Sequence, residues 1–213
     1  MRVVRVGVPA LLLAAVGTAQ AGVVNIGGGW QASWDSSLDG LVQIVSDGVA
    51  GDAVFIEKSI EFTGGFNAVP IVFTQIDPNA VSNIVINDEI ISNNSGVDWS
   101  AFRMQLIDGG DVAFDQASTA SSGGSGPIGF SISPFTTASF TPDSMQLNIG
   151  GGTVPNGTQW FPGAGVSDGQ LWMHVNLTPG QNKVFTLKES YIPTPGAVAL
   201  FGVAGLAAKR RRR

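Results

Sequence analysis

The chain has 213 residues, and only 13% of them are charged, against about 25% in an average soluble protein. It contains no cysteine, so thiol catalysis, thiolate metal sites and disulfide bonds are excluded. Its formal net charge is −5, and because an acidic chain repels phosphate backbones, we do not expect nucleic acid as a partner.

The first 21 residues have the three parts of a secretory signal peptide. Arg2 and Arg5 form a positive segment, an apolar stretch follows over 6–16, and Ala19-Gln20-Ala21 is a small-x-small cleavage site. The apolar stretch is shorter than the ~20 residues that a membrane anchor needs. We therefore predict that residues 1–21 are a signal peptide, removed after Ala21.

Residues 22–190 are predicted to form one all-β domain, because their apolar residues recur mostly with period two. In the segment 54–62, alternate residues form an apolar face on which Lys58 is the exception. Further strands are expected over 41–45, 69–76, 83–91, 102–107, 129–132, 145–149, 171–177 and 184–187. Short strands separated by turn residues, with no repeated βα unit, predict an antiparallel β-sandwich that is jelly-roll-like. The Ser/Gly-rich segment 117–127 is expected to be a long surface loop.

Enzymatic chemistry finds little support in the predicted domain. His174 is the only histidine, and no Gly-x-Ser-x-Gly elbow accompanies it, so a Ser-His-Asp hydrolase is not predicted. Glu57 and Glu61 share a strand face but would lie ~13 Å apart, beyond the ~5 to 9.5 Å of a glycosidase pair. Carboxylate pairs from different strands stay open as an alternative.

Several aspartates offer the hard oxygen ligands that calcium accepts. Asp108-Gly109-Gly110-Asp111, followed by Asp115, is the strongest candidate, and Asp35 and Asp39 are a further pair. The spacing of an EF-hand is absent, and Asp-Gly-Gly-Asp is also an ordinary hairpin connection. We favour the turn over the calcium site and expect no other cofactor.

Two tryptophans are candidates for stacking on the sugar rings of an extracellular polysaccharide. Trp160 precedes Phe161 in a loop rich in glycine and proline, and Trp172 is expected to face outward on a strand beside His174. We favour the alternative that the rings fill the core or the sandwich edge, as large aromatic side chains usually do.

The C-terminal segment 191–213 has three parts. The motif Pro193-Thr194-Pro195-Gly196 comes first, an uncharged apolar stretch covers 197–208, and a basic cluster ends the chain: Lys209, Arg210, Arg211, Arg212 and Arg213. A helix of this apolar length rises only ~20 Å, short of the ~30 Å hydrocarbon core of a bilayer. The basic cluster would stay in the cytoplasm as a stop-transfer signal, with the domain on the outer side.

This order of parts resembles a PEP-CTERM sorting signal, with Thr194 in the place of the glutamate of the eponymous motif. The resemblance implies transient insertion of the tail in the inner membrane of a bacterium and cleavage by an exosortase, a membrane-embedded cysteine protease. It further implies a secreted or cell-surface location. Such tails also carry the label of an ice-binding protein C-terminal domain, which describes the tail and is no evidence of ice binding.

A second segment, residues 91–102, is similar to an Asn-Asn-Thr-Gly-x-x-Trp-x-Asp/Ala-Phe element of many PEP-CTERM proteins. In this sequence Asn94, Ser95 and Gly96 suit a tight turn between two core strands. Trp99 and Phe102 are expected to plug the edge of the sandwich rather than to contact a ligand.

The two ends carry seven of the eleven cations, whereas all 16 acidic residues lie within 22–190. Four cations against 16 acids give the processed domain a formal charge of −12. The leading prediction is a noncatalytic, exported β-sandwich module of the cell surface or extracellular matrix. A carbohydrate-binding module is the alternative, and a glycoside hydrolase or other enzyme is the third.

Overall fold

The structure is a computed structural model that describes residues 22–107, 111–163 and 168–196. The predicted signal peptide, including Ala19 and Ala21, and the tail from residue 197 to Arg213 lie outside the described residues. The strands are β1 (Val23–Gly27), β2 (Trp30–Ser33), β3 (Val42–Ala50), β4 (Ala53–Thr63), β5 (Ala68–Gln75), β6 (Asn83–Asn94), β7 (Trp99–Ile107), β8 (Val112–Phe114), β9 (Thr137–Phe140), β10 (Gln146–Val154), β11 (Thr158–Trp160), β12 (Leu171–Val175) and β13 (Val184–Pro193). Two short helices are η1 (Ser36–Leu38) and α1 (Gln116–Ser121).

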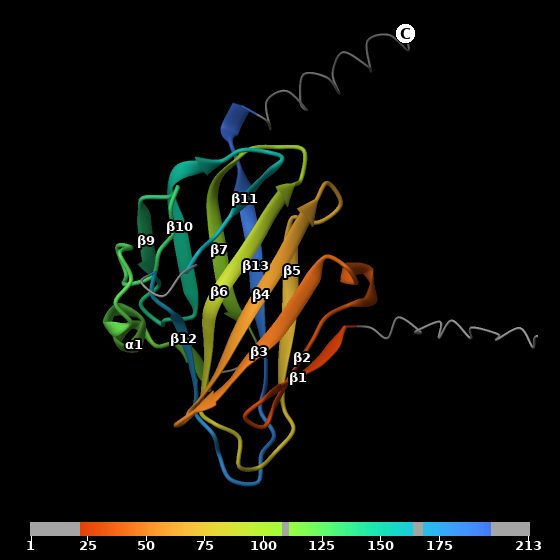
Figure 1. The fold of residues 1–213 in the computed structure, drawn as a ribbon, viewed down its shortest axis with the longest axis vertical. Coiled ribbons are helices and arrows are strands. Elements are labelled where there is room, and N and C mark those ends of the chain that lie inside the picture. The colour runs from red at the N-terminus through yellow and green to blue at the C-terminus, as the bar shows by residue number, and fades with distance from the viewer. Residues whose placement is uncertain (1–21, 108–110, 164–167, 197–213) are drawn as a thin grey trace, which may run out of the picture.

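These strands form two sheets, which confirms an all-β sandwich. The first sheet has the order β1-β2-β5-β13-β7-β10-β9, and the second has the order β3-β4-β6-β12-β8, with β11 also paired to β6. In Figure 1 the strands β3, β4 and β6 of the second sheet cross in front of β5, β13 and β7 of the first.

The prediction of antiparallel pairing is wrong for one strand pair. β4 and β6 run parallel, in a register from Ala53 opposite Asn83 to Thr63 opposite Asn94. The strand between them in the chain, β5, belongs to the other sheet. Because the chain crosses the sandwich and returns, its direction reverses twice, and β6 arrives beside β4 in the same orientation.

Two further predictions of local structure need correction. Residues 129–132 form no strand, although Phe130 and Ile132 are buried; the amide of Ser131 donates to the carbonyl of Asp168 in a loop instead. The predicted loop 117–127 begins with α1, because the side chain of Asp115 caps the helix by accepting from the amide of Ser118.

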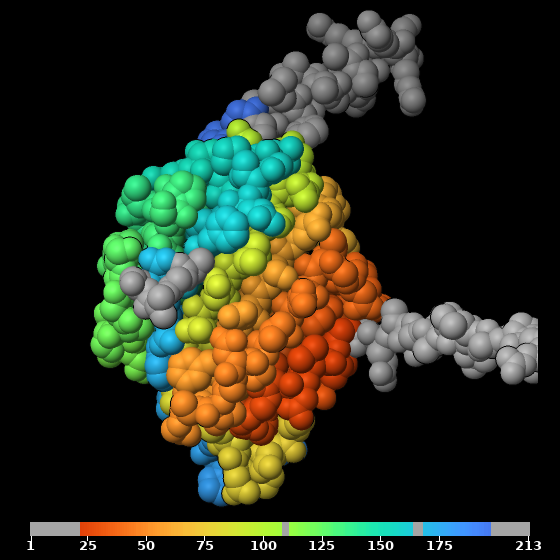
Figure 2. Space-filling view, viewed as in Figure 1, coloured from red at the N-terminus to blue at the C-terminus, as the bar shows by residue number. Residues whose placement is uncertain are grey.

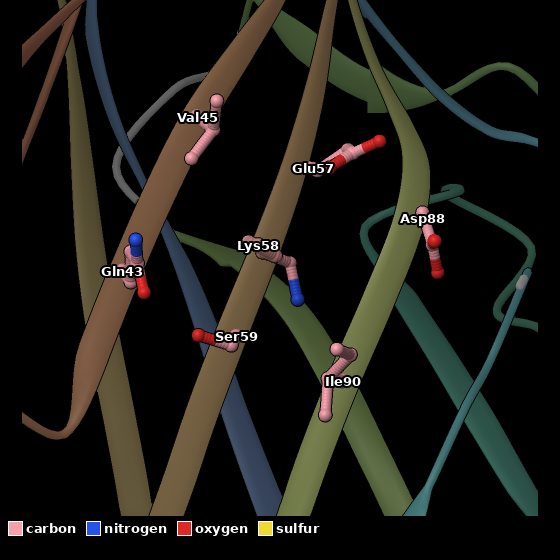
Figure 3. Close-up of a pocket in the computed structure, with 7 residues that line it drawn as sticks. All are labelled: Gln43, Val45, Glu57, Lys58, Ser59, Asp88 and Ile90. Atoms are coloured by element: carbon pink, nitrogen blue, oxygen red, sulfur yellow. The ribbon is translucent and has the colours of Figure 1, made fainter.

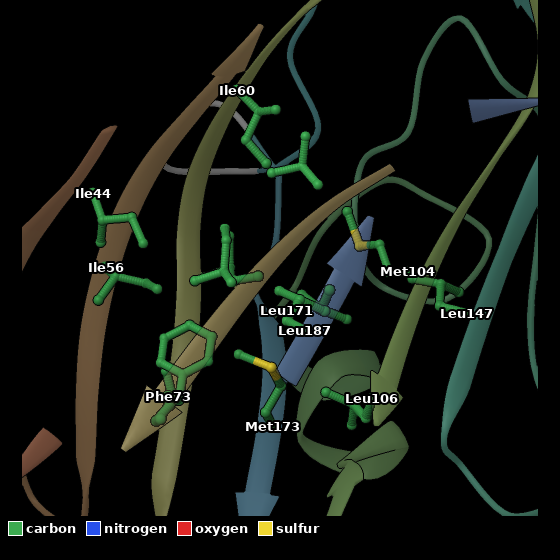
Figure 4. Packing of buried hydrophobic residues seen from close by; sticks show 14 of the residues in the cluster. Ile44, Ile56, Ile60, Phe73, Met104, Leu106, Leu147, Leu171, Met173 and Leu187 are labelled. Carbon is green, nitrogen blue, oxygen red and sulfur yellow. The ribbon is translucent and has the colours of Figure 1, made fainter. Parts of the chain in front are cut away.

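The core lies between the two sheets and is continuous from end to end. Figure 4 shows isoleucines of the second sheet facing leucine, methionine and phenylalanine side chains of the first sheet. Trp30, Trp99 and Trp160 are among its largest fully buried side chains. Lys58 is 3% exposed among these apolar residues, so the prediction that it lies on the inner face of its strand is confirmed.

Candidate functional site

The outer face of the second sheet carries a shallow hollow of about 170 Å³ over β3, β4 and β6. Figure 2 shows this face, with β3 and β4 in orange and β6 in yellow-green. The hollow is lined by both polar and apolar residues: Gln43, Val45, Glu57, Lys58, Ser59, Asp88 and Ile90. Val45 is 48% exposed and Ile90 is 38% exposed, so both present apolar surface to solvent.

Carboxyl groups from three neighbouring strands meet at one end of the hollow. The charge of Asp47, then partial burial, then the charge of Asp88 raise the pKa of Glu57. Burial, followed by the charges of Asp47 and Asp168, raises the pKa of Asp88. Figure 3 shows the Glu57 side chain directed towards β6, the strand that carries Asp88. Perturbed carboxyl groups beside a depression are typical of ligand-binding and catalytic sites.

This arrangement brings together carboxyl groups from different strands, the alternative that the sequence left open. Glu61, on the same strand as Glu57, accepts a hydrogen bond from Asn94 Nδ2 at 2.8 Å and does not line the hollow. The neighbour of Glu57 is Asp88, its register partner on the parallel strand β6. Sequence periodicity places each residue on a face but does not say which strand lies alongside, so the pair could not have been found from it.

An aromatic pair lies on the same outer face. Val85 of β6 lies opposite Phe55 on the neighbouring strand β4 and opposite Trp172 on the other neighbour, β12. The ring centroids of Phe55 and Trp172 are 6.0 Å apart, and the ring planes meet at 87°. The rings cover Val85, which is 0% exposed although it points outward from the core. Trp172 is half-buried, in agreement with its predicted outward orientation.

Trp160 fills the core, as favoured from the sequence, and does not have the exposure that stacking on sugars requires. Its side chain is 1% exposed, and its ring packs edge-on against Phe102 and Phe135 with centroid distances of 5.0 Å. The alternative, a ring that fills the core, describes Trp160. The exposed aromatic residue of this loop is Phe161, at 47%.

The aspartates proposed as calcium ligands have other partners. Asp108 lies outside the described residues. Asp111 Oδ2 accepts from Lys183 Nζ at 2.7 Å. Asp115 caps α1, and although burial opposes it, hydrogen bonds from Ser118 lower the pKa of its carboxyl. β7 and β8 belong to different sheets, so the segment between them is not the expected hairpin.

The second aspartate pair is similarly engaged. Asp35 caps η1, and Asp39 Oδ1 accepts from the amide of Gly22 at 3.0 Å. His174 Nδ1 lies 3.0 Å from Asn83 Oδ1. Within residues 22–107, 111–163 and 168–196, no three His, Asp or Glu side chains come together in a group that could hold a metal ion.

The connection from β6 to β7 has the predicted form. Gly96 has a φ of 86°, and Trp99 and Phe102 are 0% and 1% exposed, so the turn and the plugging role of both rings are confirmed. Trp99 Nε1 donates to Ser95 Oγ at 2.9 Å, which joins the ring to the turn. The buried Asn93, whose side-chain amide binds the same turn, was not predicted from the sequence.

The C-terminal Pro motif begins on the last strand of the domain. Pro193 is the final residue of β13 and is the register partner of Trp99. The amide of Thr194 donates to the carbonyl of Asp98 at 2.9 Å. Pro195 and Gly196 follow as the last described residues, and Lys209 to Arg213 lie outside them.

No helix in the part of the chain that the structure describes is long and apolar enough to cross a membrane. Comparison of the chain with family models, with curated proteins and with solved structures found no match.

Proposed function

We propose that this chain is a noncatalytic module exported by a bacterium and sorted at its C-terminus by an exosortase-type protease. Its jelly-roll-like sandwich would then act at the cell surface or in the extracellular matrix. The observation that carries the proposal is the three-part tail, which follows without a linker on β13, the strand that pairs with both β5 and β7. A signal peptide at the other end supplies the export that such sorting requires.

The packing at both ends of the domain supports these processing points. At the N-terminal end, a Cβ on Gly22 would lie 1.8 Å from the indole ring of Trp34, so the chain is closely packed from the first residue after the predicted cleavage site. At the C-terminal end, the last interstrand pair is Pro193 with Trp99. Cleavage near Pro193 to Pro195 would leave the core intact.

Intact-mass analysis of the protein from its native host tests the proposal. We expect a chain that begins at Gly22 and ends near Pro193 to Pro195. A matched pair of variants assigns the signal: the double variant Pro193→Ala/Pro195→Ala should keep its tail, whereas Pro127→Ala, in an exposed loop, should be processed normally. Surface material that retains Arg213 in the unaltered chain would refute sorting by cleavage.

Binding of an extracellular polysaccharide is a second candidate function, favoured by the outer face of the second sheet. There the half-buried ring of Trp172 shares a face with the hollow, whose carboxylates and amide would accept and donate hydrogen bonds to sugar hydroxyls. Glycan-array binding should fall with Trp172→Ala and with Gln43→Ala, and should persist with Val184→Ala, which changes an exposed residue of the first sheet. Absence of binding to every polysaccharide on the array would remove this candidate.

A further inference from the structure

Three ionisable side chains meet inside the apolar core beneath the hollow, which Lys58 also lines. They are Lys58 of β4, Glu89 of β6 and Glu189 of β13, and the side chains of all three are fully buried. Lys58 and Glu89 are register partners on the two parallel strands, whereas Glu189 enters from the opposite sheet. In Figure 3 the side chain of Lys58 extends from β4 towards β6.

The contacts within this triad are direct. Lys58 Nζ donates to Glu189 Oε1 at 2.6 Å and also contacts Glu89 Oε1. Apart from the contact with Lys58 Nζ, the carboxyl oxygens of Glu89 have no hydrogen-bond partner in the described part of the chain, and Glu189 Oε2 has none either. The ammonium group and two carboxyl groups therefore have only one another as polar neighbours among the contacts seen.

The fully ionised triad would place a net charge of −1 in an apolar core. Removing each ion from water costs several kcal/mol, and the attraction within the triad offsets this only in part. Burial lowers the pKa of Lys58, against the opposing effect of Glu189. Burial likewise raises the pKa of Glu189. The core thus favours an uncharged amine, which is the nucleophilic form of lysine, beside a protonated carboxyl group.

We propose that Lys58 Nζ and Glu89 Cδ condense to an intramolecular amide bond, with Glu189 as the group that transfers protons. The neutral amine adds to Cδ of the protonated Glu89, and the C–N bond forms. The neutral Glu189 carboxyl group accepts a proton from the nitrogen at Oε1 and delivers its own proton from Oε2 to the departing hydroxyl group. The C–OH bond then breaks and one water molecule leaves, while Glu189 returns to its starting form and nothing is oxidised or reduced.

Geometry distinguishes the roles of the two glutamates. Glu89 is the register partner of Lys58, and Oε1 of its carboxyl group contacts the amine nitrogen directly, which places Cδ beside the nucleophile. Glu189 accepts a hydrogen bond from the amine, which places it for proton transfer. Groups fixed in contact react with effective concentrations of about 10⁵ to 10⁸ M. The product replaces a buried amine and a buried carboxyl group, which the core holds only in their neutral forms, by a single amide, and this favours condensation over hydrolysis there.

Such a bond would join β4 to β6 covalently in a chain that has no cysteine. A crosslink made from lysine and glutamate does not depend on the redox state outside the cell. This inference goes beyond the proposed sorting and does not depend on it.

The test is the intact mass of the full chain, purified in folded form and measured after denaturation. We expect a mass lower than that of the sequence by one water molecule, and a proteolytic fragment in which Lys58 and Glu89 are joined. The loss should be absent in Lys58→Met and in Glu89→Leu and strongly reduced in Glu189→Gln. Lys183→Met, which removes the lysine paired with Asp111, should retain it.

The unaltered chain decides the outcome even where a variant fails to fold. A folded protein whose mass equals that of its sequence would overturn the proposal. A fragment joined through Glu189 instead of Glu89 would overturn the assignment of the two glutamates. Loss of water that persists in Lys58→Met would place the reaction elsewhere in the chain and would also contradict the proposal.

Discussion

Glu57 has a carboxyl group that the folded state holds in its neutral form more readily than the unfolded chain does. Because its pKa in the fold is raised above the ordinary 4.5, the folded protein binds this proton more tightly than the unfolded one. The stabilising effect is complete below pH 4.5 and is lost as the pH rises through the folded pKa. At neutral pH the charge of Glu57 therefore opposes folding.

The variant Glu57→Gln tests this interpretation. Thermal unfolding should show a higher Tm than the unaltered chain at pH 7, and the difference should shrink towards pH 4, where the parent carboxyl group is itself protonated. Glu61→Gln is the control on the same strand face, since its carboxylate accepts a hydrogen bond from Asn94 and its removal should not stabilise the fold. An equal rise in Tm for both variants would show that the three-strand carboxyl cluster has no special effect.

At the scale of elements, the connection between β6 and β7 depends on a single buried amide. Asn93 is 0% exposed; its Nδ2 donates to the carbonyls of Val97 and Val154, and its Oδ1 accepts from Ser95. These bonds join the turn to the end of β10. Each buried polar group left without a partner costs about 1–3 kcal/mol. Because the Asn93 side chain binds several such groups, its loss should destabilise the fold more than the loss of a single hydrogen bond.

We expect Asn93→Ala to lower the free energy of unfolding by about 3 kcal/mol, because the buried carbonyl of Val154 loses its side-chain donor and the carbonyl of Val97 loses one of two. Asn94→Ala is the matched control. The side chain of Asn94 is exposed and donates only to Glu61, so its removal should change the free energy of unfolding by no more than about 0.5 kcal/mol. Urea unfolding followed by tryptophan fluorescence measures both. Similar losses of unfolding free energy in the two variants would contradict the role that we assign to the hydrogen bonds of Asn93.

At the scale of the whole molecule, charge works against folding. After removal of both ends, four cations and 16 acidic residues remain, a formal charge of −12. Mutual repulsion of so many like charges destabilises the compact state, and salt screens it with a Debye length of about 10 Å at 0.1 M.

The processed protein should therefore gain stability as NaCl is raised from low concentration at pH 7. Differential scanning calorimetry would record the Tm, and a reducing agent should leave it unchanged because the chain has no cysteine. The full chain with its basic ends, at −5, should respond less to salt. A Tm that falls with added NaCl would indicate that attractive ion pairs outweigh the repulsion.

Local patterns in the sequence were sufficient to predict all-β structure, the inner-face position of Lys58 and the turn at Gly96. Each depends on a period of two or on the backbone freedom of glycine, which are properties of adjacent residues. Trp160 was harder to place, because a Gly/Pro loop does not reveal whether its aromatic residue points inward. The cover formed by Phe102 and Phe135 comes from distant parts of the chain.

The sequence by itself determined which residues alternate between the two faces of each strand, and it carries the motifs at both ends. Only the tertiary structure decided which strands are neighbours. The crossing of β5 to the other sheet makes β4 and β6 parallel partners, which brings Glu57 to Asp88 on one face and Lys58 to Glu89 on the other. Glu189 joins that group from 131 residues away. Strand periodicity is local, whereas these pairings follow from register and from the packing of two sheets on one core.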